Sequence, residues 1–283
     1  MSDTAPPAGA LSSGDAFHHT YDARSPPARP SEHHVRFVVI SDTHSTEPSD
    51  VPDGDVLLHC GDLTDIGGTE AFERQIAWLR SLPHPRKIII AGNHDHAADN
   101  STGWYEREGY KIHEEYSQPR ADPARVRQLL QDRSGGLRYL EDEALELTVD
   151  RDGVRDKCWR IYGSPWTPVF GSWAWNYERG AEHASAIPSN TDILMTHGPP
   201  HGYGGLDVVH SGANVGCEAV TQRLEAGEIR PRLHAFGHIH EARGVSRHEW
   251  SSEHSTIFAN AAIADIDMGA FRERVFRYRV RHR

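Results

Sequence analysis

The chain has 283 residues, 37% of them hydrophobic, so it is long enough for one large domain or two small ones with a substantial core. Its formal net charge of -11 argues against a scaffold that holds nucleic acid through phosphate contacts, since such proteins normally carry a basic excess. The three cysteines are widely spaced and form no C-x-x-C pair, so we expect no disulfide framework and a reducing compartment.

Residues 1–34 predict a disordered, Pro-rich N-terminal tail, and residues 35–283 predict the folded domain. The tail has very few large aliphatic side chains, so it cannot bury enough surface to order itself. Its two His-His pairs are expected to be solvated rather than to bind metal. No basic segment followed by an apolar stretch opens the chain, and no run of about 18 apolar residues occurs. We therefore expect no signal peptide, no contact with a membrane, and cytoplasmic residence.

Five short apolar or mixed runs are typical of buried strands, and a cluster of polar residues directly follows each of them. The runs are residues 35–40, 55–60, 87–91, 192–196 and 233–236. Between the second and third runs, residues 69–81 predict a helix with Thr69 as its N-cap and Pro83 as its stop. This strand-helix-strand alternation predicts an α/β fold whose ligand site lies beyond the strand ends.

The hydrophobic pattern also predicts two more helices and two strands near the end of the chain. Residues 123–131 and 213–226 predict helices, and the second of these is expected to close at Gly227. Residues 256–259 and 275–280 are typical of late strands.

The polar clusters at the strand ends are rich in residues that bind metal ions. They contain Asp42, His44, Asp62, Asn93, His94, Asp95, His197, His238 and His240. Together they offer more ligands than one first-row ion can use, so the economical interpretation is a two-metal hydrolytic centre in which one carboxylate bridges both ions. The pattern therefore predicts an enzyme that cleaves phosphoesters.

Each cluster alone has a simpler interpretation. In an extended segment, residues i and i+2 project to the same side, so Asp42 and His44 can reach one cation, but Asp and His also occur together often on surfaces. Asp62 follows a glycine that permits a tight turn, where it can lean over the sheet edge or merely cap the turn. Asn93 is likewise compatible with a turn. Recurrence at five strand ends is what favours the metal site.

In chain order, Asp42-x-His44, Gly61-Asp62, Gly92-Asn93-His94-Asp95, His197-Gly198 and Gly237-His-x-His240 resemble the motifs of the calcineurin-like metallophosphoesterases. The resemblance covers residues 37–241. Within that superfamily, Gly163-Ser-Pro-Trp166, His197-Gly-Pro-Pro200 and Phe258-Ala-Asn-Ala-Ala262 resemble the metallophosphoesterase-domain-containing phosphodiesterases first noted in brain tissue. The fold implied by this resemblance is a four-layer α/β/β/α sandwich, with two mixed sheets face to face and helices outside.

The resemblance also implies a role for each residue at the site. One ion would be held by Asp42, His44, Asp62 and His240, and the other by Asp62, Asn93, His197 and His238. Asp62 would bridge ions about 3.5 to 4 Å apart, which hold a hydroxide poised for in-line attack. His94 would protonate the leaving oxygen, and Asp95 is a candidate for orienting the His94 ring. The donor set favours Mn, Fe or Zn without choosing among these divalent metal ions.

A run of aromatic residues between positions 166 and 177 is the candidate substrate-contacting segment. It could stack a nucleobase, with Trp166 as the best single residue, or it could be core packing or an anchored loop, which is the favoured alternative. The leading hypothesis is a phosphodiesterase acting on a small, perhaps cyclic, nucleotide. A phosphomonoesterase, including a protein phosphatase, and a non-catalytic scaffold are the alternatives. The sequence leaves the oligomeric state open.

Overall fold

A computed structural model of the protein describes residues 9–10, 16–19, 21–99, 102–150, 158–180 and 183–264. Within them, four parallel strands form one sheet in the order β3 (Phe37–Ile40), β4 (Val56–Cys60), β5 (Arg86–Ile90) and β6 (Leu137–Tyr139). The second sheet has the order β13 (Gly244–Glu249), β14 (Ser255–Asn260), β12 (Leu233–Phe236), β11 (Ile193–Thr196), β8 (Cys158–Ser164) and β7 (Glu143–Thr148). It is mixed, because β13 and β7 pair antiparallel at its two edges.

Two small sheets complete the strands of the described part. They are β1 (Gly9–Ala10) with β2 (Ala16–Phe17), and β9 (Thr167–Pro168) with β10 (Asn176–Tyr177). The α-helices are α1 (Thr69–Ser81), α2 (Tyr110–Glu115), α3 (Pro123–Gln131) and α4 (Glu218–Glu225). A π-helical turn over Tyr105–Gly109 leads directly into α2.

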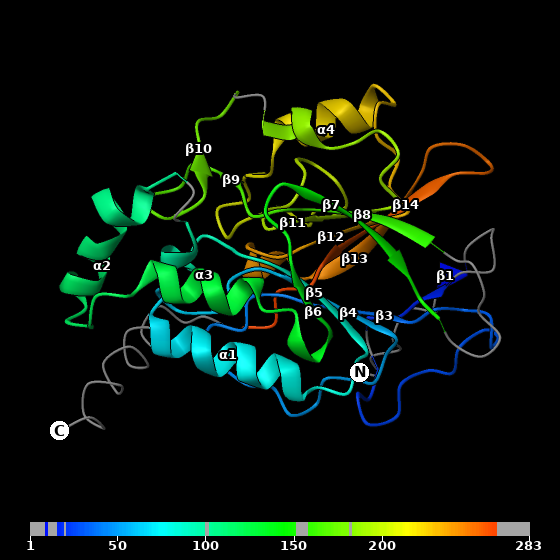
Figure 1. The fold of residues 1–283 in the computed structure, drawn as a ribbon. Coiled ribbons are helices and arrows are strands. Elements are labelled where there is room, and N and C mark those ends of the chain that lie inside the picture. Colours follow the sequence, from blue (N-terminus) through cyan, green and yellow to red (C-terminus); the bar gives the residue numbers. More distant parts are fainter. Residues whose placement is uncertain are drawn as a thin grey trace, which may run out of the picture.

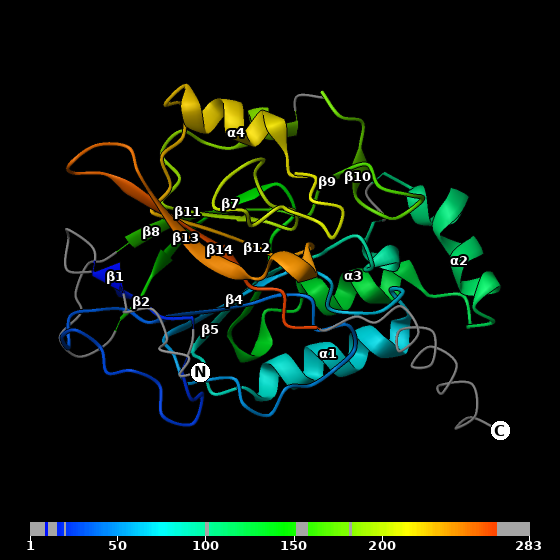
Figure 2. The ribbon, with the colours of Figure 1, turned by 180° about the vertical axis from the view of Figure 1, so that it is seen from behind.

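The two main sheets lie face to face, with α1 and α3 outside one of them and α4 outside the other (Figure 1). The view from behind shows the same order of layers (Figure 2). Side chains alternate along β4 accordingly: Leu57 packs with the apolar face of α1, whereas Val56 and Leu58 pack between the sheets. A third apolar cluster joins the second sheet to α4. The expected four-layer α/β/β/α sandwich is confirmed.

The helix predictions hold in part. The bounds of α1 and α3 match those expected, but Thr69 does not cap α1: Gly68 is the N-cap, and the Thr69 hydroxyl accepts a hydrogen bond from Asp122 N instead. The helix expected from residue 213 begins only at Glu218, because residues 213–217 bind neighbouring loops through their backbone. Cys217 N, for example, donates to Pro199 O at 2.9 Å. Gly227 follows the end of α4 with φ of +76°, as expected.

The two ends of the chain are only partly described. In the predicted tail, Arg29 donates to the Asp55 carboxylate at 3.0 Å, and Arg36 binds Pro27 O, so part of this segment contacts the domain. The boundary at residue 34 and the disorder of the tail stay predictions. Residues 256–259 fall in β14 as expected, whereas the strand predicted at residues 275–280 lies outside the described residues. Among the described residues, no helix is both long enough and apolar enough to span a membrane.

Candidate metal centre

The polar residues predicted from the strand ends come together at one edge of the sandwich. The four-stranded sheet supplies Asp42 and His44 after β3, Asp62 after β4, and Asn93 and His94 after β5. The six-stranded sheet supplies His197 after β11, and His238 and His240 after β12. Since these strands all run in the same direction within their sheets, their carboxyl ends meet at one edge, as expected for a ligand site in an α/β fold.

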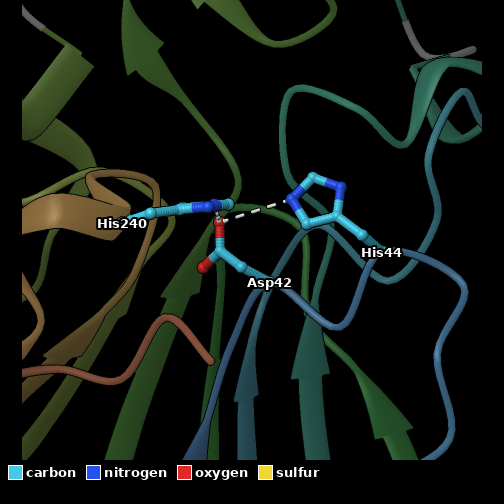
Figure 3. A group of neighbouring side chains, drawn as sticks. All are labelled: Asp42, His44 and His240. Carbon is cyan, nitrogen blue, oxygen red and sulfur yellow. Dashed lines mark hydrogen bonds and ion pairs between the residues drawn. The ribbon is translucent and has the colours of Figure 1, made fainter. Parts of the chain in front are cut away.

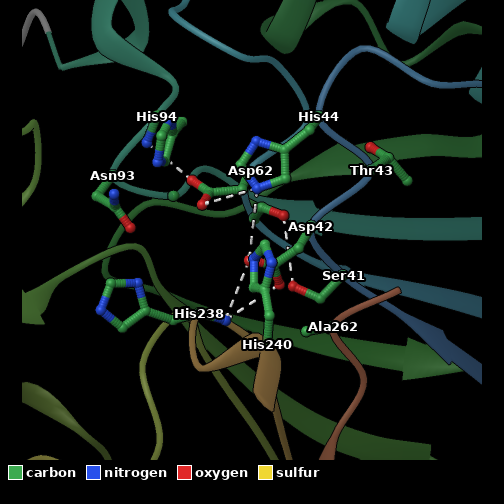
Figure 4. Close-up of polar contacts among 12 residues, drawn as sticks. Ser41, Asp42, Thr43, His44, Asp62, Asn93, His94, His238, His240 and Ala262 are labelled. Atoms are coloured by element: carbon green, nitrogen blue, oxygen red, sulfur yellow. Dashed lines mark hydrogen bonds and ion pairs between the residues drawn. The ribbon is translucent and has the colours of Figure 1, made fainter. Parts of the chain in front are cut away.

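Three groups of these side chains are spaced closely enough to hold a metal ion. They are Asp42 with His44 and His240, Asp62 with His44 and His94, and Asp62 with His197 and His238. Within each group the candidate ligand atoms lie within 4.8 Å of one another. Asp62 belongs to two groups and His44 to two, so the groups form one continuous cluster. Figure 4 shows the Asp62 carboxylate between His94 and His44.

Asp42 is the centre of the first group (Figure 3). Its Oδ1 lies 2.9 Å from His240 Nε2 and 3.9 Å from His44 Nε2. The backbone N–H of His238 donates to the same carboxylate, which ties Asp42 to the loop after β12. His44 is fully buried, and neither of its ring nitrogens has a hydrogen-bond partner. Carboxylate oxygens of Asp62 and Asp65 lie 3.6 and 3.8 Å from its Nε2 and Nδ1, too far for hydrogen bonds. A metal ion between Nε2 and the carboxylates would satisfy this buried nitrogen.

His197 shows the same need for a positive charge. Its Nδ1 donates to Cys60 O at 2.8 Å, which directs Nε2 to within 2.9 Å of Asn93 Oδ1 and 3.3 Å of Asp62 Oδ2. Both of these oxygens are acceptors, so the nitrogen beside them must carry either a proton or a metal ion. Fixing one ring nitrogen on a carbonyl is the usual way in which proteins orient a metal-binding histidine.

The pKa values reflect two carboxylate–imidazole pairs. Burial alone would lower the pKa of His197, but the Asp62 carboxylate raises it to about 9. Burial would also lower the pKa of His240, but the hydrogen bond to Asp42 raises it above its usual value. Burial would raise the pKa of Asp62, yet the charges of His197 and His94 hold it well below its usual range. Without metal, protonated His197 therefore supplies positive charge beside the Asp62 carboxylate.

The backbone at the site differs from the expected extended segments. Asp42, His44, Asp62 and His238 all have φ between +43° and +69°, in the left-handed region that non-glycine residues rarely adopt. Asp42 and His44 lie close together, as expected, but turns rather than the extended geometry that was predicted direct their side chains. Each such residue stores roughly 1–3 kcal/mol of strain, which the surrounding structure must offset. The tight turn expected at Gly61 is present, with φ of +98°.

His94 occupies the position expected for it, but Asp95 does not orient its ring. His94 Nδ1 donates to the carbonyl of Asp65 at 2.7 Å, and its backbone N–H donates to Asp62 Oδ1 at 2.8 Å. The buried Asp95 carboxylate instead accepts from three backbone N–H groups and from the Thr64 hydroxyl. That prediction is wrong because adjacent residues in a turn point in different directions.

The aromatic segment also differs in detail from the expectation. Trp166 Nε1 donates to Asp142 Oδ2 at 2.8 Å, and its ring meets Trp175 edge-on. Trp173, and not Trp166, stacks on His94, with ring centroids 4.4 Å apart. A nucleobase contact by Trp166 stays a prediction. Sequence reasoning singled out neither Trp173 nor Asp65, although both lie in segments that the motifs had marked.

Asn260 gives a structural role to the Phe258–Ala262 motif, which the sequence analysis used only as a family resemblance. It is buried, and its side-chain amide donates to Ile239 O at 2.8 Å and to Leu206 O at 3.1 Å. Ile239 lies between His238 and His240, so Asn260 holds the loop that carries both histidines. The Phe258–Ala262 motif therefore supports the candidate metal centre from β14.

Comparison with known proteins agrees with this geometry. The family model described as calcineurin-like phosphoesterase matches residues 35–242. The metallophosphoesterase domain-containing protein 1 of Homo sapiens and that of Mus musculus are each 37% identical over 254 residues, covering 87% of this chain and 70% of theirs. A probable rhamnogalacturonate lyase C of Emericella nidulans is 39% identical over 74% of this chain, within 17% of its own length. The chain thus belongs to the calcineurin-like phosphoesterase family, whose members are metal-dependent phosphoester hydrolases.

Proposed function

We propose that this protein is a two-metal phosphodiesterase acting on a small nucleotide, with cyclic nucleotides among the candidate substrates. The observation that carries the proposal is the sharing of Asp62 between two groups of potential metal ligands, which is the arrangement expected of a bridging carboxylate. In this assignment Asp42, His44, Asp62 and His240 hold one ion, and Asp62, Asn93, His197 and His238 hold the other.

The residues present fit a pair of divalent ions. The ring nitrogens of His44 have no hydrogen bond and lie beside carboxylates, and two oxygen acceptors face His197 Nε2, so a divalent ion suits both positions. Imidazole, amide and carboxylate donors suit Mn, Fe or Zn. Such ions supply charge neutralisation for a bound phosphate and lower the pKa of water.

The protein's own contribution to the reaction is centred on His94. Its Nδ1 is held by Asp65 O, so Nε2 is the nitrogen that can pass a proton to the leaving oxygen of the substrate. His94 lies within 4.8 Å of the ligand atoms of His44 and Asp62, close to where a phosphate would bind. Unlike His44 and His197, its side chain is partly exposed, as contact with a substrate requires.

Metal-free protein reconstituted with Mn²⁺ tests the choice between diester and monoester. We expect bis(4-nitrophenyl) phosphate to be hydrolysed with a higher kcat/KM than 4-nitrophenyl phosphate. A preference for the monoester would assign the protein to the phosphatases, and no turnover of either by metal-loaded protein would favour a binding role. Cyclic and linear nucleotides are the next substrates to compare. Cytoplasmic residence belongs to the same proposal.

Two variants separate metal binding from chemistry. Asp62→Ala should lose both ions and all activity, because it removes the shared ligand. His94→Gln should keep its metal content and lose on the order of 10²–10⁴-fold in kcat on a diester whose leaving oxygen needs a proton, such as an alkyl or unsubstituted phenyl diester. His18→Gln replaces an exposed histidine far along the chain from the motifs and should match the unmodified protein. Loss of metal from His94→Gln would make His94 a ligand instead.

A further inference from the structure

Trp173 is an aromatic side chain in direct contact with His94. Its indole stacks on the His94 imidazole with an interplanar angle of 30° and ring centroids 4.4 Å apart. The same indole also stacks on His96, at 5.4 Å and 27°. His96 is fully buried, and the stack therefore connects His94 to a fixed part of the interior.

The loop that carries Trp173 is attached to the backbone of the metal centre. Ala174 N donates to Asn93 O at 3.2 Å, and Trp175 N donates to Asp99 Oδ2 at 3.1 Å. Thr167 N donates to Trp175 O at 2.9 Å and closes the base of the loop. These bonds flank Trp173 in sequence and set its distance from the segment containing His94.

Gly171 provides the space for the indole. A Cβ atom at this position would lie 3.1 Å from Trp173 Nε1, closer than nearly all real Cβ contacts, and its φ of +65° disfavours other residues. The half-buried indole therefore lies against Gly171, His96 and His94.

From this arrangement we infer that Trp173 is a positioning residue for proton transfer by His94, an inference that rests on the proposed function. The hydrogen bond to the Asp65 carbonyl holds one edge of the imidazole, but that bond alone leaves the plane of the ring free to turn about it. Stacking on Trp173 removes that freedom and keeps the plane of the ring constant. Misplacement of a catalytic group by about 1 Å can cost 10²-fold in rate, so this restraint has a measurable effect.

The test uses two diesters that differ only in the leaving group: methyl 4-nitrophenyl phosphate and methyl phenyl phosphate. The nitrophenolate leaves readily without a proton, whereas the more basic phenolate needs one in the transition state. Loss of proton transfer therefore slows the phenyl ester far more than the nitrophenyl ester. A general loss of structure would slow both esters alike.

Trp173→Ala should lower kcat for the phenyl ester about 10- to 100-fold and for the nitrophenyl ester by less than about threefold, with little change in KM or bound Mn²⁺. Trp173→Phe should restore most of the loss, and Gly171→Ala should give a milder form of it. Trp250→Ala removes another half-buried tryptophan, one whose ring contacts His248 and the Arg230 guanidinium, and should affect neither ester selectively.

His94→Gln distinguishes failure of the inference from failure of the proposed function. If His94→Gln shows the dependence on leaving group and Trp173→Ala slows both esters equally or raises only KM, Trp173 has no positioning role. If His94→Gln itself shows no such dependence, the assignment of His94 as the proton donor is wrong, and the inference about Trp173 is overturned with it.

Discussion

Replacing Asp95 by Asn should destabilise the metal-free protein, even though the two side chains have the same shape. Asp95 Oδ2 accepts from Leu63 N and Gly92 N, and Oδ1 accepts from Thr64 N and the Thr64 hydroxyl, at 2.8 to 3.1 Å. Asparagine keeps one oxygen and replaces the other by an amide nitrogen. If this nitrogen replaces Oδ2, two buried donors, Leu63 N and Gly92 N, lose their acceptor and face another donor. If it replaces Oδ1, Thr64 N loses its acceptor, while the Thr64 hydroxyl can turn and accept from the amide.

The expected loss follows from the donors that lose their acceptor. A buried donor left unsatisfied costs about 1–3 kcal/mol, so one or two cost about 1–6 kcal/mol. Removing a buried charge offsets part of this, because burial and the Asp62 carboxylate raise the pKa of Asp95 to about 7. We therefore expect a net loss of about 1–4 kcal/mol in the free energy of unfolding.

Urea denaturation in the presence of a chelator measures this loss, with Asp132→Asn as the control at an exposed aspartate that also binds nearby donors. The control should change stability by less than about 0.5 kcal/mol.

The stability that Asp95 contributes should also depend on pH, because its pKa is higher in the folded protein than in the unfolded chain. The contribution from this pKa difference is complete below pH ~4 and is lost as pH rises through about 7. The difference between unmodified protein and Asp95→Asn should thus be larger at pH 5 than at pH 8. A loss below about 0.5 kcal/mol at both values would refute the account of the four donors.

Three further predictions concern protons, the ligand loop and the core. Asp62 raises the pKa of buried His197 to about 9, so the stability of the metal-free protein should fall between pH ~6.5 and 9, and Mn²⁺ binding at pH 7 should release protons. Calorimetry in buffers of different ionisation enthalpy counts them, and no release would contradict the pairing. Asn260→Ala, which frees Ile239 O, should weaken metal binding about 10-fold, measured by competition with a chelator. Leu57→Ala should cost about 2–5 kcal/mol in urea denaturation, and a cost under about 1 kcal/mol would place this fully buried side chain outside the core.

The strand ends were predictable from the sequence because apolar runs and polar clusters alternate in a fixed order. The runs that became β3, β4, β5, β11 and β12 are short and almost wholly buried, and such runs are distinctive. Two strands at the sheet edges, β7 (residues 143–148) and β13 (residues 244–249), have mostly exposed or half-buried side chains. The hydrophobic pattern of the sequence did not predict either of them. Edge strands lack the long apolar runs on which the prediction depended.

The site was predicted in its residue types but only partly in its contacts. The metal-binding motifs consist of side chains that act directly, and these are visible in a sequence. Asp65 acts through its backbone carbonyl, which any residue possesses, so no side chain indicated its role. Trp173 was one of several aromatic residues in its segment, and only the loop's hydrogen bonds to Asn93 and Asp99 determine which of them meets His94. Roles that depend on tertiary position could not be read from local pattern.

The division of the candidate ligands between the two sheets has a mechanical consequence. Asp42, Asp62 and Asn93 belong to one layer of the sandwich and His197 to the other, so ions bound there would join the layers at one edge. Separation of the sheets would then require release of the ions, and the free energy of metal binding would add directly to the resistance against that opening. The apolar residues packed between the sheets, such as Leu58 and Met195, would in turn set the spacing at which the ions are held. Packing far from the chemistry would thereby influence the distance between the two metals.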